Sequence, residues 1–109
     1  MTYKEIASMI ESIGLPYAYY QFSEDTAEAP PFVVFFYSQT ADQYADDLNY
    51  QRIEQLNIEL YTSEKDFELE ARIEKLLSDH GLTYYREENY LDSEKMYQIA
   101  YETEVIING

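Results

Sequence analysis

Apolar residues recur at helical spacing in two separate segments of the chain. The first stripe consists of Ile6, Met9, Ile10 and Ile13, and the second consists of Leu69, Ile73, Leu76 and Leu77. A capping box formed by Thr2 and Glu5 precedes the first stripe, and Gly14 follows it, so we expect a helix over about residues 3–13. We expect Ser63 to cap the second helix, with Asp66 at the capping-box spacing, and Gly81 to end it.

Other segments have the patterns of β-strands. They are Leu15–Phe22, Phe32–Ser38, Ile53–Tyr61, Leu82–Tyr90 and Lys95–Ile107. The segment Phe32–Ser38 is continuously apolar, which is typical of a strand buried on both faces, whereas Ile53–Tyr61 alternates between apolar and polar residues. The predicted order is α-β-β-β-α-β-β. We therefore expect one α+β domain over residues 1–109, with a mostly antiparallel sheet of about five strands and two helices on one face.

This arrangement leaves one face of the predicted sheet uncovered. The strand Phe32–Ser38 is apolar on both sides, and tyrosines near residue 19 add aromatic surface. Two alternatives follow: the second face contacts another protein or another copy of the chain, or a loop such as 23–31 folds over it. The residues predicted to form an interface are Tyr19, Tyr20, Phe35, Tyr37, Tyr44, Asp46, Asp47 and Tyr50.

The chain is strongly acidic, with 22 Asp and Glu against 7 Lys and Arg, for a formal charge of −15. Binding to nucleic-acid phosphates depends on Lys and Arg, so we expect no specific nucleic-acid binding. The acidic residues are dispersed along the chain, which indicates a charged folded surface. An acidic protein of this kind could also mimic DNA and inhibit a host DNA-binding enzyme. That alternative requires carboxylates in a row along one face, whereas here they are spread over both predicted helices and several strands.

The sequence contains no motif that indicates catalysis or a cofactor. It has no Cys and only 3 Gly, which excludes a thiolate metal site and a glycine-rich phosphate loop. The single His, His80, lies in the predicted last turn of the second helix, where a partly cationic ring suits the helix dipole. Asp46, Asp47 and Asn49 could hold a hard cation, but a solvated acidic loop is the favoured interpretation. We predict no enzymatic activity, no cofactor and no metal.

The N-terminal segment lacks the apolar stretch of a signal peptide, and the longest apolar run, PPFVVFFY, is too short to span a membrane. We therefore expect no membrane partner.

Most of the chain, over residues 15–107, resembles a family of virion proteins. The segments that carry the resemblance are PPFVVFFY, the acidic ADDLNY, ELYT followed by KD at Glu59 to Asp66, and YLDSEKMYQIAYE. They are similar to the small tail-completion or tail-terminator (head-tail joining) proteins of long-tailed bacteriophages and prophages of Gram-positive bacteria.

The resemblance implies a ring, usually of six copies, that sits on the end of the tail tube. The expected partners are further copies of the chain, the tail tube protein and the head connector protein. The expected location is the head-tail junction of the virion, after synthesis in the host cytoplasm. A head-to-tail ring needs two different complementary patches on each subunit, and the aromatic strands and the acidic loop are the candidates.

Overall fold

The fold is taken from a computed structural model that describes residues 1–23, 28–38 and 52–108. In chain order the described elements are α1 (Tyr3–Glu11), β1 (Tyr17–Tyr19), β2 (Phe32–Ser38), β3 (Arg52–Thr62), α2 (Phe67–Asp79), β4 (Tyr85–Leu91) and β5 (Met96–Ile107). This order confirms the predicted α-β-β-β-α-β-β arrangement and the α+β class.

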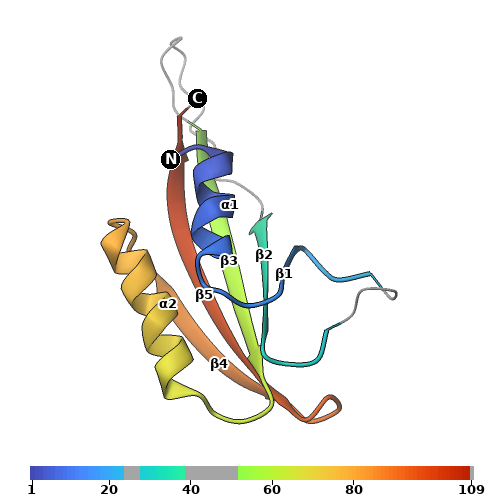
Figure 1. The fold of residues 1–109 in the computed structure, drawn as a ribbon. Coiled ribbons are helices and arrows are strands. Elements are labelled where there is room, and N and C mark those ends of the chain that lie inside the picture. Colours follow the sequence, from blue (N-terminus) through green and yellow to red (C-terminus); the bar gives the residue numbers. More distant parts are fainter. Residues whose placement is uncertain (24–27, 39–51, 109) are drawn as a thin grey trace.

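The described strands form one sheet in the order β1-β2-β3-β5-β4 (Figure 1). The pairs β2–β3, β3–β5 and β4–β5 are antiparallel, which confirms a mostly antiparallel sheet. The long strands β3 and β5 form its centre and are paired along their whole length, from Arg52 opposite Ile107 to Thr62 opposite Tyr97.

The first strand differs from its prediction. The strand predicted over Leu15–Phe22 is too long, because β1 contains only Tyr17–Tyr19, and β1 runs parallel to β2 within the mostly antiparallel sheet. Its hydrogen bonds to β2 begin at the Pro16 carbonyl, which accepts from Val33 N at 2.9 Å, and end at Tyr20 N, which donates to the Phe35 carbonyl at 2.8 Å. Tyr20 has a positive φ of 72°, so the chain turns away there and ends the strand.

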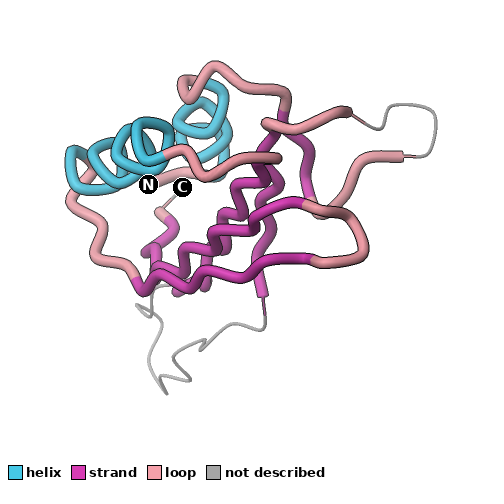
Figure 2. Tube along the Cα trace, turned by 90° about the horizontal axis from the view of Figure 1, so that it is seen from below, coloured by secondary structure: helices cyan, strands magenta, loops and turns pink. Residues whose placement is uncertain are grey.

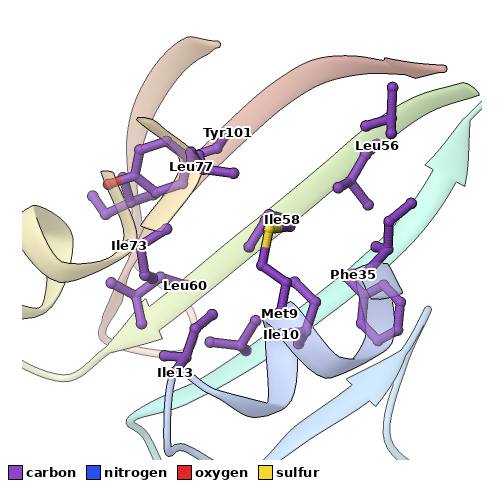
Figure 3. Packing of buried hydrophobic residues seen from close by; sticks show 14 of the residues in the cluster. Met9, Ile10, Ile13, Phe35, Leu56, Ile58, Leu60, Ile73, Leu77 and Tyr101 are labelled. Atoms are coloured by element: carbon purple, nitrogen blue, oxygen red, sulfur yellow. The ribbon is translucent and has the colours of Figure 1, made fainter. Parts of the chain in front are cut away.

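Both helices lie on the same face of the sheet, as predicted (Figure 2). The core fills the space between this helix layer and the sheet, and Figure 3 shows its packing. Its fully buried members include Ile6 and Ile10 from α1, Ile73 and Leu77 from α2, Leu56, Ile58 and Leu60 from β3, and Ile99, Tyr101 and Val105 from β5. The alternation along β3 and β5 therefore places every second residue against the helices.

The helix ends follow local capping chemistry. The Thr2 hydroxyl accepts from Glu5 N at 3.0 Å and Thr2 N donates to the Glu5 carboxylate at 2.8 Å, which confirms the predicted capping box of α1. The prediction that Ser63 caps α2 is wrong. Asp66 is the N-cap instead, and its carboxylate accepts from Leu69 N at 3.0 Å. Gly81, with φ of +71°, ends α2 as predicted.

Candidate interaction surface

Tyrosines gather on the helix side of the sheet where β1 forms its edge. This tyrosine cluster consists of Tyr3, Tyr17, Tyr19 and Tyr37 around Phe35. The Tyr19 ring lies 5.3 Å from the Phe35 ring and 5.9 Å from the Tyr37 ring, measured between centroids. The Tyr3 ring approaches the Tyr37 ring edge-on at 5.3 Å. Such edge-on pairs stabilise the cluster beyond the area that they bury.

The tyrosine cluster presents aromatic surface to solvent. Tyr19 is 52% exposed, and Tyr3 and Tyr17 are also exposed. The hydroxyls of Tyr3 and Tyr17 donate to nearby carboxylates. Tyr3 donates to Glu54 at 2.9 Å, and Tyr17 donates to Glu11 at 3.1 Å. These contacts fix the rings, so little side-chain entropy remains to be lost when a partner binds.

Two tyrosines of the cluster, Tyr3 and Tyr37, stay protonated at neutral pH. Burial, together with the neighbouring Tyr19, Tyr3 and Glu54, raises the pKa of Tyr37 to about 12. Burial and the hydrogen bond to Glu54 also raise the pKa of Tyr3. Its rings therefore form an amphipathic surface, apolar in the body and polar at the hydroxyl, as is common at protein interfaces.

A second aromatic patch lies on the opposite side of the same sheet edge. The turn at Tyr20 places this ring on the face away from the helices, 5.6 Å from the Phe36 ring. Phe22 packs edge-on against Phe32 at 5.3 Å, and Phe32 stacks on Tyr61 at 4.9 Å. We call these five residues, Tyr20, Phe22, Phe32, Phe36 and Tyr61, the aromatic groove.

Four members of the aromatic groove, all except Phe36, line a shallow hollow of about 250 Å³. Its lining residues are Tyr20, Gln21, Phe22, Glu28, Phe32, Val34 and Tyr61. Val34 at its base is only 6% exposed, whereas Tyr20 at its rim is 65% exposed. The hollow is therefore an apolar depression that a partner side chain could fill.

The sheet face away from the helices was expected either to contact a partner or to be covered by a loop of the chain itself. The residues that follow β1, Tyr20 to Phe22, pack against β2, so part of that face is covered from within the chain. The strand β2 is buried on both faces at its centre, as predicted for Phe32–Ser38, but Phe32 and Phe36 remain half-buried. The cover is thus incomplete.

The predicted interface residues fall in three groups. Tyr19 and Tyr37 meet in the tyrosine cluster, and Phe35 is buried beneath them as their support. Tyr20 lies on the other face, in the aromatic groove. The remaining predicted residues, Tyr44, Asp46, Asp47 and Tyr50, lie outside the described residues.

Sequence reasoning missed several members of both patches. Tyr3 was assigned only to a helix and Tyr61 only to an alternating strand. Their approach to Tyr37 and Phe32 depends on how α1 and β3 lie against β2. One local signal was available: Phe32, Val34 and Phe36 are separated by two residues each, so their side chains lie on the same face of the strand.

A separate cluster of charges joins α2 to β4. Glu70 is only 4% exposed and pairs with Lys65 at 2.7 Å and with the Arg86 guanidinium. The Arg86 side chain also contacts Glu74, which accepts from the fully buried Tyr101 hydroxyl at 2.8 Å. The hydrogen bond from Arg86 to Glu70 raises the pKa of Arg86, and burial raises the pKa of Tyr101. The buried Glu70 carboxylate therefore has two cationic partners, Lys65 and Arg86, which offset the cost of removing its charge from water.

The described residues hold no obvious centre for metal chemistry. No group of three or more His, Cys, Asp or Glu side chains is placed to bind a metal within 1–23, 28–38 and 52–108. His80 lies at the end of α2, the position predicted for it, and its Nδ1 is 2.8 Å from the Leu76 carbonyl oxygen. In the same ranges, no helix has the length and apolar character needed to cross a membrane.

The sequence matches no known protein-family model and no curated protein. The fold is similar to that of a chain in the solved structure of the virion of a native gene transfer agent (GTA) particle, with a TM-score of 0.64. The two chains are 14% identical, and the similarity covers 94% of this chain and 86% of the other. At this identity the comparison shows a shared fold.

Proposed function

We propose that the chain is a structural protein of a phage-like virion that acts by binding and carries out no catalysis. In its specific form, the proposal is a ring, formed by six copies, that caps the tail tube and joins it to the head connector. The observation that carries the proposal is the similarity to a chain of a gene transfer agent virion, which extends over most of both chains. The resemblance of residues 15–107 to tail-terminator proteins supports the same role.

The β1 edge supplies the two patches that ring formation requires. A head-to-tail ring joins one surface of each subunit to a different surface of the next. The tyrosine cluster and the aromatic groove lie on opposite faces of the same edge, and each exposes aromatic rings. In the proposed ring, the tyrosine cluster of each copy contacts the aromatic groove of its neighbour.

The charge of the chain fits a component through which DNA passes. A formal charge of −15 repels phosphate groups, so DNA would not adhere to such a ring. The same charge opposes contact between copies in dilute salt, because the repulsion between subunits is screened only at higher ionic strength. Association should therefore strengthen as salt is raised.

Native mass spectrometry and light scattering over a range of protein concentrations would test the proposed self-association. We expect copies to associate as protein and salt concentrations rise, with a hexamer as the largest closed species. Tyr19→Ser should shift the association to at least about tenfold higher protein concentration, because Tyr19 is the most exposed ring of the tyrosine cluster.

Tyr85→Ser is the matched control. Tyr85 is 82% exposed but lies on β4, at the opposite edge of the sheet from β1. This variant should associate like the unmodified chain. If Tyr19→Ser and Tyr85→Ser behave alike, the β1 edge is not the contact between copies.

An acidic DNA mimic is the second candidate, and one observation favours it. The sheet face away from the helices carries Glu59, Glu87, Glu102 and Glu104, as the strand register shows. Further carboxylates lie on α1 and α2, which argues against a single phosphate-like row. Pull-down of purified restriction and repair enzymes tests this role, and it is discarded if none of them binds.

A further inference from the structure

The sheet face away from the helices has a composition of its own. Side chains that oppose one another across antiparallel strands share a face, so the register assigns each residue. On β3, β5 and β4 this open face holds Ile53, Gln55, Asn57, Glu59, Tyr61, Met96, Gln98, Ala100, Glu102, Glu104, Ile106, Tyr85, Glu87, Asn89 and Leu91. It is a surface of amides and carboxylates, bordered on the β2 side by the aromatic groove.

All the cationic side chains of the protein lie elsewhere. The 7 Lys and Arg residues are Lys4, Arg52, Lys65, Arg72, Lys75, Arg86 and Lys95, and each is a described residue. Lys4, Arg72 and Lys75 are on the helices, Lys65 precedes α2, and Lys95 is in the β4–β5 turn. Arg52 and Arg86 point to the helix side, because they oppose Ile107 and Tyr101. The four carboxylates of the open face thus have no Lys or Arg beside them on that face.

Hydrogen bonds order the middle of the open face. Asn89 donates to Gln98 at 3.3 Å, Gln98 donates to the Tyr61 hydroxyl at 2.8 Å, and Tyr61 donates to Glu59 at 2.8 Å. This ladder crosses β4, β5 and β3 and ends on a carboxylate. Side chains that are already fixed lose less entropy when a partner docks on them.

A cavity of about 550 Å³ opens at the edge of this face, where β4 begins. Its lining consists of Gln55, Thr83, Tyr84, Tyr85, Glu102, Thr103 and Glu104. Glu102 and Glu104 are two residues apart on β5, so their carboxylates project side by side, roughly 7 Å apart along the strand. The exposed Tyr85 lies beside them, opposite Glu102 in the register.

We propose that the open face docks an arginine-bearing segment of a partner protein, with one guanidinium seated in the cavity between Glu102, Glu104 and Tyr85. A second copy of the chain is a poor occupant, because its Arg72 and Arg86 are already engaged by the Ile13 carbonyl and by Glu70, and its own open face lacks cations. Nucleic acid is excluded because its phosphates carry the same sign of charge as the open face. A basic protein segment is the partner that complements this face. The inference does not depend on the proposed virion role.

Arginine fits the cavity better than lysine does. The planar guanidinium can donate to two carboxylates at once and can stack on an aromatic ring, and the cavity offers two carboxylates and Tyr85. The Gln55 side chain adds an amide oxygen at the same rim. A lysine ammonium brings the same charge and can also lie over an aromatic ring, but it lacks the planar fork that donates to two carboxylates at once.

Titration of the full-length, ¹⁵N-labelled protein with the peptide acetyl-Arg-Gly-Arg-Gly-Arg-amide tests the proposal at physiological salt. We expect amide shifts concentrated at Gln55, Tyr85 and residues 102–104. The same peptide with lysine in place of arginine should bind several-fold more weakly. Shifts scattered over the helices, or equal affinity for both peptides, would overturn the proposal.

Two sets of variants separate the site from the total charge. Glu102→Gln with Glu104→Gln should weaken binding of the arginine peptide about tenfold, because both charged acceptors are lost. Glu64→Gln with Glu68→Gln removes the same charge from exposed positions near α2 and should change the affinity less than twofold. Tyr85→Ala leaves the charge unaltered and should still weaken binding. An equal loss in both Gln pairs means that net charge alone attracts the peptide, and the proposal fails.

Discussion

Arg86→Leu is the substitution that tests most sharply how the helix layer is held to the sheet. Arg86 reaches from β4 to Glu70 and Glu74 on α2, and Glu70 is almost completely buried. The variant removes the guanidinium while the Glu70 carboxylate stays in place. The carboxylate then loses one of its two charged partners in a poorly solvated position.

The size of the effect follows from the partners that remain. Removing one member of a buried ion pair costs about 3–5 kcal/mol of unfolding free energy. Lys65 still contacts Glu70 at 2.7 Å, and the Arg86 side chain is itself 33% exposed, so part of this cost is avoided. We expect Arg86→Leu to lower the free energy of unfolding by about 2–3 kcal/mol, or on the order of 15 °C in Tm for a domain of this size.

Urea denaturation followed by circular dichroism measures this loss. Glu70→Leu combined with Arg86→Leu should be at least about 1 kcal/mol more stable than Arg86→Leu alone, because no uncompensated carboxylate stays buried. Lys75→Ala is the control, since its pair with Asp79 is exposed and should contribute less than about 0.5 kcal/mol. Glu70 and Arg86 do not form a stabilising buried pair if Arg86→Leu costs no more than Lys75→Ala, or if adding Glu70→Leu destabilises the protein further.

Three further predictions concern the core, the tyrosines and the end of α2. Ile58→Ala should cost about 3–4 kcal/mol in urea denaturation, because Ile58 is fully buried, whereas the exposed Ile106→Ala should cost less than about 1 kcal/mol. The pKa values of Tyr37 and Tyr61 are raised to about 12, so both rings favour the folded state while protonated. Stability should therefore be intact below pH 10 and fall between about pH 10 and 12; unfolding curves and absorbance at 295 nm check this, and constant stability over that range would contradict it. Gly81→Ala should cost about 1 kcal/mol by thermal denaturation, because φ is +71° there, and an unchanged Tm would show that the left-handed turn is not required.

Local patterns along the chain predicted most of the fold. Thr2 and Glu5 specify the start of α1 within four residues of sequence, and the alternation through Leu56, Ile58 and Leu60 specifies which side of β3 is buried. The capping box and the alternation depend on residues that are close together in the sequence, so the sequence alone reveals them. The parallel pairing of β1 was missed because it depends on where β2 lies relative to Pro16 and Tyr20.

The candidate interaction surface was predicted only in part. Tyr19 and Tyr37 were identified because aromatic residues cluster in that part of the sequence. Tyr3 and Tyr61 were missed because they reach the β1 edge only after α1 and β3 pack against β2. The pairing of Glu70 with Arg86 was missed for the same reason, since it joins α2 to β4 across 16 residues.

The measurement that tests the proposed virion role most directly is negative-stain imaging of particles made in cells that lack this protein. If the chain caps the tail tube and joins it to the head connector, those cells should produce overlong tails or tails without heads. Expression of the intact chain should restore normal particles. Normal, complete particles in the absence of the protein would contradict the account.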